Sequence, residues 1–394
     1  MRLLVLPLHL LVINMKAKTV TTNAKGGLVK PHGFDRYFFI IVLVITVAGL
    51  LAFVSASLGI LAKSESKFYG VLFNQLVFGF IGGLAALWVT AQIPYIFWRK
   101  YAFALFVGTV LLTLCVFIPG LGFAHGGAQR WLSIGPISLQ PAELLKIGFI
   151  IYFASWLAWT RKKEQEFKYK IAPLAVLLAI VAGALLIQPD TKSLILITAA
   201  ASGMLFVSGV EWKKILGFFV LGVVALTILA FARPYVMTRI KTFINPASDP
   251  RGASYQLQQG LIAIGSGGIA GRGLGQSVQK FNYLPEPQGD SIYAVIGEEF
   301  GFVGSTLLVV LYIFLAIRGY KIAMNARDAF GLYLSVGIIS LIIAQSFLNI
   351  ASLVGLFPLT GVPLVFISHG GTSLFIALAA VGIVLNVSKY QKNV

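Results

Sequence analysis

The chain has 394 residues, of which 58% are hydrophobic and 11% charged, and its mean hydropathy is +0.89. This composition excludes a soluble globular protein and is typical of a polytopic membrane protein. The net charge of +18 does not indicate nucleic-acid binding, because the basic residues gather between hydrophobic runs as a topology signal does. The single cysteine, Cys115, excludes an intrachain disulfide, and the four histidines have no spacing suited to zinc.

Residues 1–36 are expected to form a cytoplasmic tail, because they carry six basic residues before or at the start of the first hydrophobic run. The apolar stretch that follows Arg2 resembles the hydrophobic part of a signal peptide. A true start at Met15 explains this stretch at least as well, since the sequence from there begins Met-Lys-Ala-Lys, as a cytoplasmic tail would.

Hydrophobic runs of about 20 residues, the length that crosses the hydrocarbon core, predict ten transmembrane helices. We therefore expect an all-α membrane domain over residues 37–388, with a cytoplasmic tail at 389–394. If both termini are cytoplasmic, 20 of the 31 Lys and Arg residues lie on the inner side, and Arg161-Lys162-Lys163 is the strongest marker of that side. The predicted spans are residues 37–58, 72–93, 101–119, 143–160, 171–188, 193–210, 213–232, 291–317, 329–355 and 363–388.

The outer segment 119–142 is too polar to face lipid, and it contains Arg130 in the run Gly-Ala-Gln-Arg-Trp-Leu. It leads into the fourth span, where Glu143 and Lys146 lie three residues apart and can face each other across one helical turn. Two opposite charges inside a span indicate either a mutually neutralising structural pair or the lining of a cavity for a lipid head group.

The fifth span ends in Gln-Pro-Asp190, where Asp190 is either a cap of the next helix or an outer-face carboxylate of a site. A long outer loop, residues 233–290, separates the seventh and eighth spans. Its residues 255–264 have the pattern of a short amphipathic or re-entrant helix that begins with Tyr255 and Gln256. The glycine-rich run 265–275, which includes Arg272, is either a tight connector or a place where the backbone closely approaches a phosphate or sugar.

The long loop closes with residues 279–290, which include Lys280, Glu286 and Asp290. Asp290 stands directly before the eighth span, so we expect its carboxylate at the mouth of a membrane helix. A charge there is costly unless it has a function.

Glu298 and Glu299 lie about 12 Å deeper than Asp290 if the eighth span is a regular helix. We expect one of them to face the Glu143 and Lys146 pair and to complete a buried polar network. A direct part in catalysis is the alternative.

Residues 358–373 form a broken apolar region that contains Ser368 and His369. Non-helical backbone at membrane depth is tolerated only where it is buried in protein or lines a wet cavity. This region, the segments 119–142 and 188–190 and the end of the long loop all lie on the outer side in the topology above. The sequence therefore predicts one site on the outer face.

Taken together, these segments resemble the SEDS family of bacterial shape, elongation, division and sporulation proteins, and they are more similar to its division branch than to its elongation branch. The resemblance extends over about residues 37–388. It is carried jointly by residues 127–132, 140–146, 188–190, 255–256, 279–286, 290, 297–301 and 358–373.

The resemblance implies a ten-helix peptidoglycan glycosyltransferase that polymerises lipid II, an undecaprenyl-diphosphate-linked disaccharide peptide, in septal wall synthesis. It places the protein in the bacterial cytoplasmic (inner) membrane, with a class B penicillin-binding protein and divisome proteins as partners. It also assigns the family's essential carboxylate to Asp290. The chain departs from the family pattern at Gly289 and Ser291, where Thr and Phe are usual, at Lys192-Ser193, where Gly-Thr is usual, and at His369, where Tyr is usual.

The implied reaction joins a sugar 4-hydroxyl to the anomeric carbon of a second disaccharide and expels a lipid diphosphate. Asp290 is the candidate general base, or the ligand of a divalent cation such as Mg²⁺ or Mn²⁺, and no cofactor is certain. An α-linked donor that gives a β-linked product requires inversion, and therefore direct attack. The candidates for binding the diphosphate are Lys280, Arg272 and Arg130, and the other expected substrate-binding residues are Glu286, Asp190, Tyr255, Gln256 and Ser368.

Two other functions remain open at this point. A lipid II flippase would also use many helices and an intramembrane charge pair, and a non-enzymatic scaffold would only recruit a penicillin-binding protein. The polar segments crowd on the outer face rather than at the midplane, and the sequence has no visible inverted repeat, which argues against a transporter.

Overall fold

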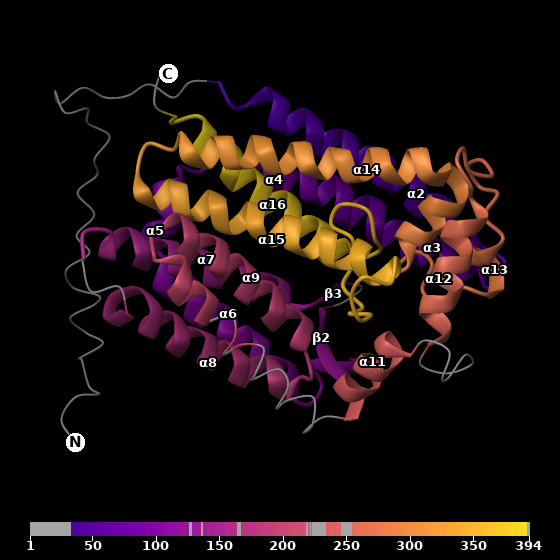
Figure 1. Ribbon diagram of the computed structural model, residues 1–394, viewed down its shortest axis with the longest axis horizontal. Coiled ribbons are helices and arrows are strands. Elements are labelled where there is room, and N and C mark those ends of the chain that lie inside the picture. The colour runs from indigo at the N-terminus through magenta and orange to yellow at the C-terminus, as the bar shows by residue number, and fades with distance from the viewer. Residues whose placement is uncertain are drawn as a thin grey trace.

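The computed structural model describes residues 33–125, 128–134, 137–163, 167–217, 220, 222, 234–245 and 254–391, which are mainly helical (Figure 1). The helices up to residue 207 are α2 (Arg36–Leu61), α3 (Glu65–Phe73), the π-helix η1 (Asn74–Gly82), α4 (Gly83–Gln92), α5 (Tyr95–Lys100), α6 (Ala102–Leu114), the short 3-10 helix η2 (Cys115–Phe117), α7 (Pro141–Thr160), the π-helix η3 (Phe167–Ile171), α8 (Ala172–Ile187) and α9 (Thr191–Val207). The later ones are α11 (Pro234–Ile244), α12 (Tyr255–Ser266), α13 (Gln279–Asn282), α14 (Ile292–Met324), α15 (Ala329–Leu353) and α16 (Gly371–Ser388).

The long apolar helices agree with the predicted spans. Among the described residues, seven helical segments are long and apolar enough to cross a membrane, and two shorter apolar helices coincide with the predicted third and sixth spans. The predicted seventh span, residues 213–232, lies mostly outside the described residues. The length and composition of these helices are those of a multi-pass membrane protein.

Several helices begin at the residues that local chemistry favours. Asp35 caps α2 by accepting a 2.9 Å hydrogen bond from the Phe38 backbone N–H, and Asp328 caps α15 in the same way through Gly331. Pro141 occupies the first turn of α7, where a missing N–H costs nothing. Asp35 also forms a 2.8 Å ion pair with Arg318 of α14, which ties the start of α2 to the far end of the longest helix.

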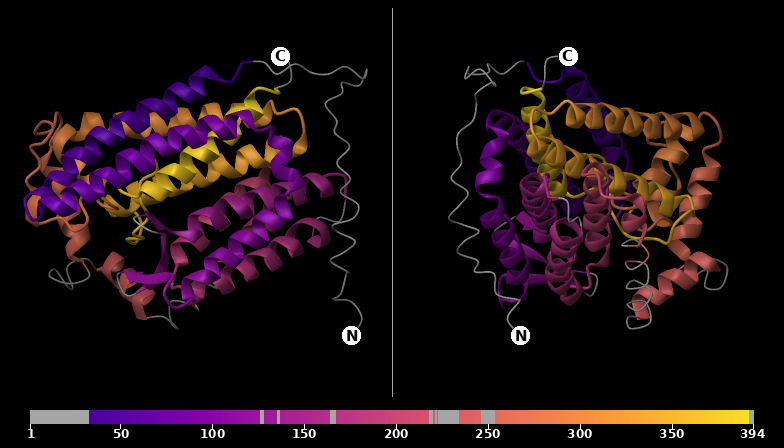
Figure 2. Two further views of the ribbon diagram at one scale, coloured as in Figure 1. Left: turned by 180° about the vertical axis from the view of Figure 1, so that it is seen from behind. Right: turned by 60° about the vertical axis from the view of Figure 1, so that its left-hand side comes forward.

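The helices pack side by side into one bundle (Figures 1 and 2). Within it, α15 contacts α7, α9 and α14, and α16 packs closely against α4 and η1. Gly79 and Gly83 allow that close approach, since a Cβ at Gly83 would come within 2.7 Å of Leu378. The helices of the long loop, α11, α12 and α13, lie toward the end of the bundle opposite the C-terminus (Figure 1).

The expectation of a purely α-helical fold needs one correction. The outer segment contains a three-stranded antiparallel sheet formed by β1 (Gly122–His125), β2 (Ala128–Ile134) and β3 (Ile137–Leu139) in the order β1-β2-β3. Ser133 pairs with Ser138, and Phe123 pairs with Trp131. The sheet pairs the backbone groups of a segment that is too polar to continue as a membrane helix.

The last span also begins later than predicted, at Gly371 rather than at residue 363. The segment from 354 to 370 is irregular, and its backbone polar groups are satisfied by buried side-chain amides. Gln75 of η1 donates to the Ser368 carbonyl at 3.2 Å and accepts from the Gly370 N–H at 3.0 Å. These bonds explain how a non-helical segment is held between helices.

Helix α14 is kinked where the glycine-rich run packs against it. Gly301 has a φ of +63°, a conformation that favours glycine, and a Cβ there would lie 2.3 Å from the Gly271 nitrogen. The carbonyls of Glu298 and Glu299 accept hydrogen bonds from the N–H groups of Arg272 at 3.0 Å and Gly273 at 2.9 Å. The close backbone approach expected of this run is therefore made to α14.

Candidate active site

Asp290 lies in the turn before α14, and elements from three parts of the chain surround it. The Gln256 side chain, from α12, donates to Asp290 Oδ1 at 3.1 Å and to Ser291 Oγ at 3.0 Å. Asn349 of α15 donates to the Asp290 carbonyl and to the Val362 carbonyl, both at 2.7 Å. The half-buried carboxylate is thus fixed through its side chain and its backbone.

Two cationic side chains meet Asp290 around Gly361. Lys192, in the first turn of α9, donates from Nζ to the Gly361 carbonyl at 2.7 Å. Arg239 of α11 donates from Nη1 to the neighbouring Leu359 carbonyl. A Cβ placed at Gly361 would lie 3.3 Å from Asp290 Oδ2 and 3.6 Å from Arg239 Nη2, so these groups surround one glycine. We call Asp290, Gln256, Lys192, Arg239 and Gly361 the Asp290 cluster.

The Asp290 cluster holds a carboxylate in a partly desolvated place. Burial raises the pKa of the Asp290 carboxyl above its ordinary value, because the charged form loses water. The hydrogen bond from Gln256 and the charges of Lys192 and Arg239 oppose this rise in the pKa. A carboxylate with a raised pKa is a better proton acceptor than an exposed aspartate.

Two of the predicted substrate-binding residues, Arg130 and Asp190, bind neighbouring parts of the protein. Arg130 donates from Nε to the Gln188 carbonyl at 3.0 Å and from Nη2 to the Pro189 carbonyl at 2.5 Å. Asp190 is fully buried and caps α9 by accepting from the Ser193 N–H at 3.4 Å, and it also accepts from the Ser193 hydroxyl at 2.8 Å. These contacts shape the outer end of α8 and the start of α9, which carries Lys192.

Ser368 and His369 belong to the irregular segment that forms another wall of the site. Ser368 is buried, and its hydroxyl accepts a 2.8 Å hydrogen bond from the Leu364 N–H. The backbone N–H of His369 donates to the Gln288 carbonyl at 2.7 Å, and its ring stacks on Phe53 with centroids 5.9 Å apart. The Ser368 hydroxyl is thus bonded within its own segment, and the His369 backbone connects that segment to the turn before Asp290.

Tyr255 and Glu286 flank the Asp290 cluster in the chain. Tyr255 is the first residue of α12 and is half-buried, one position before Gln256. Glu286 is exposed, and its carbonyl accepts a 2.9 Å hydrogen bond from the Gly289 N–H in the turn that leads to Asp290. Its φ of +45° makes this a strained turn.

Glu143 and Lys146 form the pair that their spacing predicts, with 2.9 Å between Nζ and Oε1. Lys146 also donates to Gln345 Oε1 at 2.9 Å, and Ser373 donates to Glu143 Oε2 at 3.2 Å. They line a small cavity of about 20 Å³, whose other walls are mainly apolar residues of α15 and α16. The pair is therefore mutually neutralising and also lines a cavity.

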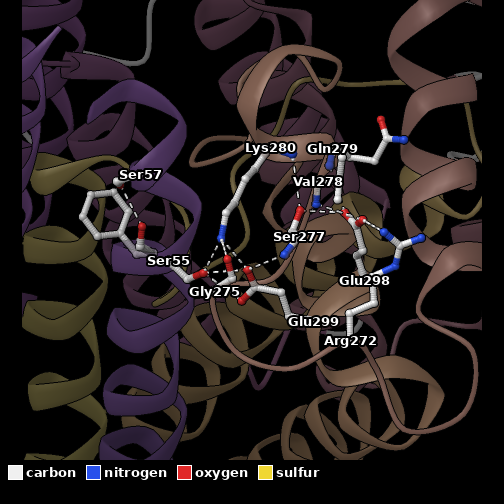
Figure 3. A network of polar contacts seen from close by, with 11 residues as sticks. Ser55, Ser57, Arg272, Gly275, Ser277, Val278, Gln279, Lys280, Glu298 and Glu299 are labelled. Carbon is white, nitrogen blue, oxygen red and sulfur yellow. Dashed lines mark hydrogen bonds and ion pairs between the residues drawn. The ribbon is translucent and has the colours of Figure 1, made fainter. Parts of the chain in front are cut away.

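Glu298 and Glu299 form a buried network with the long loop and α2, rather than with the Glu143 and Lys146 pair (Figure 3). Lys280 Nζ contacts Glu299 Oε1 at 2.7 Å, Ser55 Oγ at 2.9 Å and the Gly275 carbonyl at 2.8 Å. The Lys280 side chain is 0% exposed. Lys280 is therefore enclosed in this network, where no diphosphate can reach its ammonium group without rearrangement of the loop.

Glu298 is compensated separately within the same network (Figure 3). It accepts hydrogen bonds from the Ser277 hydroxyl at 2.6 Å and the Val278 N–H at 3.1 Å. Arg272 lies 3.3 Å from its Oε1, while the Arg272 side chain remains 42% exposed. Each glutamate thus has its own cationic partner within the network.

The surroundings of Asp290 do not fit a divalent cation. The charged groups nearest to it around Gly361 are Lys192 and Arg239, which would repel a metal ion. In the described part of the chain, no three residues of the His, Cys, Asp and Glu types gather at one place. The cluster therefore fits a general base at Asp290 better than a metal ligand.

Four residues of the site were not identified from the sequence: Lys192, Arg239, Asn349 and Gly361. A lysine in the first turn of a helix opposes the helix dipole, and this unfavourable placement was a signal for Lys192. Gly361 lies within the broken region 358–373 that the sequence assigned to the site. Arg239 and Asn349 gave no local signal, because their contacts join residues far apart in the chain.

The chain is similar to known proteins over most of its length. Residues 35–393 match the family model for the FtsW, RodA and SpoVE proteins, described as "Cell cycle protein". The probable peptidoglycan glycosyltransferase FtsW of Geobacter metallireducens is 38% identical, with 94% of this chain and 99% of that protein aligned. Stage V sporulation protein E of Bacillus subtilis is 39% identical, with 91% of this chain and 98% of that protein aligned.

Two solved structures are similar over nearly the whole chain. One is a chain of a peptidoglycan synthase complex, described for its coordination of polymerization and crosslinking, with 26% identity, a TM-score of 0.74 and coverage of 91% and 98%. The other is the rod shape determining protein RodA of Thermus thermophilus, with 25% identity, a TM-score of 0.67 and the same coverage.

Proposed function

The chain belongs to the FtsW, RodA and SpoVE family of cell cycle proteins, and we propose that it is a peptidoglycan glycosyltransferase. In this proposal it polymerises lipid II at the outer face of the cytoplasmic membrane. The observation that carries the proposal is the Asp290 carboxylate, which Gln256 and Asn349 fix beside two cationic side chains. Its relatives named FtsW support a role in septal wall synthesis.

An α-linked donor and a β-linked product require direct, inverting transfer, and Asp290 is the one carboxylate of the Asp290 cluster that can act as its base. In the proposed step, Asp290 accepts the proton of the acceptor 4-hydroxyl while that oxygen forms a bond to the anomeric carbon of the donor. The bond from that carbon to the diphosphate oxygen breaks, and the diphosphate leaves with the electron pair. The neighbouring cations stabilise the charge that develops on this leaving group.

We propose that Arg239 and Lys192 stabilise the departing diphosphate. The sequence predicts Lys280, Arg272 and Arg130 for this role. Lys280 is enclosed by its ion pair with Glu299, and Arg130 donates to two carbonyls. Arg272 is partly exposed but pairs with Glu298 at the kink of α14. Gln256 and Tyr255 remain proposed substrate-binding residues, since α12 carries both beside Asp290.

Family membership and the distribution of basic residues support a location and a partner. We place the protein in the bacterial inner membrane with both termini in the cytoplasm, as the basic residues indicate. A penicillin-binding protein that crosslinks the product is the proposed partner, because a structural relative belongs to a complex of polymerization and crosslinking. The Asp290 cluster then faces the side where the wall is built.

A polymerisation assay with labelled lipid II in detergent tests the proposal. The wild-type protein, with and without candidate penicillin-binding partners, is expected to make glycan chains, and Asp290→Asn is expected to lower the rate by about 10² to 10⁴. Asp328→Asn makes the same chemical change at the cap of α15, and should retain activity. Absence of polymer from the wild type under all these conditions would favour a flippase or a scaffold.

A further inference from the structure

Lys192 stands in an unfavourable place for a cation. It is the second residue of α9, where the helix dipole is positive and where anionic side chains are preferred. The side chain is nevertheless half-buried, and its Nζ donates a 2.7 Å hydrogen bond to the Gly361 carbonyl. Burial and the dipole both make this charge costly, so its position calls for an anionic partner.

The anionic side chains near Lys192 are already engaged in other contacts. Asp190 accepts the hydroxyl of Ser193, and Asp290 Oδ1 accepts the side-chain amide of Gln256. Both carboxylates still attract the ammonium group, and Arg130 repels it. Among the described residues, Gly361 provides the one hydrogen-bond acceptor of Lys192 Nζ, which leaves two N–H groups for a ligand.

The groups around Gly361 carry opposite charges on one small surface. Arg239 and Lys192 are cations, and Asp290 Oδ2 would lie 3.3 Å from a Cβ at Gly361. A neutral sugar hydroxyl fits the carboxylate, and a phosphate anion fits the cations. Gly361 has a φ of +63°, and because it lacks a Cβ, no side chain stands between Asp290 Oδ2 and Arg239 at this position.

We propose that Lys192 binds the diphosphate of a lipid-linked donor directly, as a fixed cation that the Gly361 carbonyl holds next to Asp290. This inference rests on the proposed function for the identity of the lipid. It makes Lys192 a substrate-binding residue that recognises the charge of the diphosphate, whereas the polyprenyl chain binds elsewhere.

Equilibrium binding to the full-length protein in detergent tests this role without turnover. The probes are undecaprenyl diphosphate, uncharged undecaprenol and inorganic pyrophosphate. Loss of one charge-assisted hydrogen bond predicts that Lys192→Met weakens undecaprenyl diphosphate binding about tenfold or more. Lys192→Arg should stay within about threefold of the wild type, and undecaprenol binding should stay within about twofold in both variants.

Lys241→Met is the matched control, because it removes the same charge from an exposed position of α11, close in sequence to Arg239. It should bind undecaprenyl diphosphate like the wild type. Equal binding by Lys192→Met and the wild type would overturn the proposal, as would equal loss of diphosphate and undecaprenol binding. If pyrophosphate binds as tightly as the lipid and only its binding depends on Lys192, the site recognises free phosphate and the lipid assignment is wrong.

The binding experiment and the polymerisation assay can fail independently. A wild-type protein that makes no glycan but binds undecaprenyl diphosphate through Lys192 would leave the binding site and remove the enzymatic function. If the wild type makes glycan and Lys192→Met binds undecaprenyl diphosphate as the wild type does, the proposed function stands and the proposed role of Lys192 is wrong.

Discussion

Asp290 is a carboxylate that the fold keeps where its charge is costly. Gln256 gives its side chain one hydrogen bond, and Asn349 holds its backbone carbonyl rather than its carboxylate. Burial raises its pKa, so the folded state binds a proton at Asp290 more tightly than the unfolded state does. The fold thus gives up stability above that pKa to present a proton acceptor.

This cost predicts how Asp290→Asn changes stability. At low pH the aspartic acid is neutral in both states, so the variant and the wild type should melt alike. As the pH rises from about 4 through the raised pKa, only the wild type acquires a desolvated charge, and its melting temperature should fall relative to the variant. Melting in detergent between pH 4 and pH 8 measures this difference. A variant that melts below the wild type at pH 8 would mean that the cations stabilise the charge more than burial destabilises it.

The same carboxylate predicts the acid limb of the pH–rate profile. As a base, Asp290 must be deprotonated, so polymerisation should rise with pH through its raised pKa. The Lys192 charge lowers that pKa, and therefore Lys192→Met should move the acid limb to higher pH. Initial rates across the pH range, with Lys241→Met as control, measure the shift. An unchanged acid limb would mean that the Lys192 charge does not affect the pKa of Asp290.

The sequence could predict the role of a residue when its contacts are close in the chain, and could not when they are far apart. Asp190 as a helix cap and the Glu143 and Lys146 pair follow from spacings of three residues. Lys280 contacts Ser55, which is 225 positions away in the chain, and no local pattern reports that contact. Lys280, which precedes Asp290 in the same loop, was therefore assigned to substrate binding, although the fold buries it.

At the scale of elements, the glycine-rich run and α14 form one unit. The run donates backbone hydrogen bonds to the carbonyls near the kink at Gly301, and α13 begins where Glu298 accepts N–H groups. The sequence predicted either a tight connector or close approach of these glycines to a phosphate or sugar, whereas the observed approach is to the backbone of α14. A positive φ inside a helix depends on what packs against it, and here the target is 30 residues further along the chain.

The Lys280 and Glu299 ion pair predicts a nonadditive effect on stability. Lys280→Met leaves Glu299 buried with only the Ser55 hydroxyl and the Ser277 N–H as donors, and should destabilise the protein by about 3 to 5 kcal/mol. The double variant Lys280→Met with Glu299→Gln removes both charges and should recover most of that loss. Melting of the single and double variants, with the exposed Lys63→Met as control, decides between pair and separate roles. Equal damage from both would show that the two residues act independently.

At the scale of the whole molecule, hydrophobic length predicted most of the helices. The described spans follow runs of about 20 apolar residues, whose backbone groups must pair internally in lipid. The irregular segment before α16 was placed partly inside a span, because its composition is apolar. Its bonds come from Gln75, which is 293 positions away in the chain, and from Asn349 of the preceding helix α15. The outer sheet likewise depends on pairing between strands that the composition does not report.

The orientation of the chain in the membrane determines whether the Asp290 cluster faces the lipid-linked sugars. The basic residues place Lys162 in the cytoplasm and the glycine-rich run outside. Ile269, at 76% exposure, is an accessible labelling position in the outer loop. With Cys115 replaced by Ala, an impermeant thiol reagent should label Ile269→Cys in intact spheroplasts and should label Lys162→Cys only after lysis. Labelling of Lys162→Cys in intact cells, with Ile269→Cys protected, would turn the site toward the cytoplasm, where it could not extend the wall.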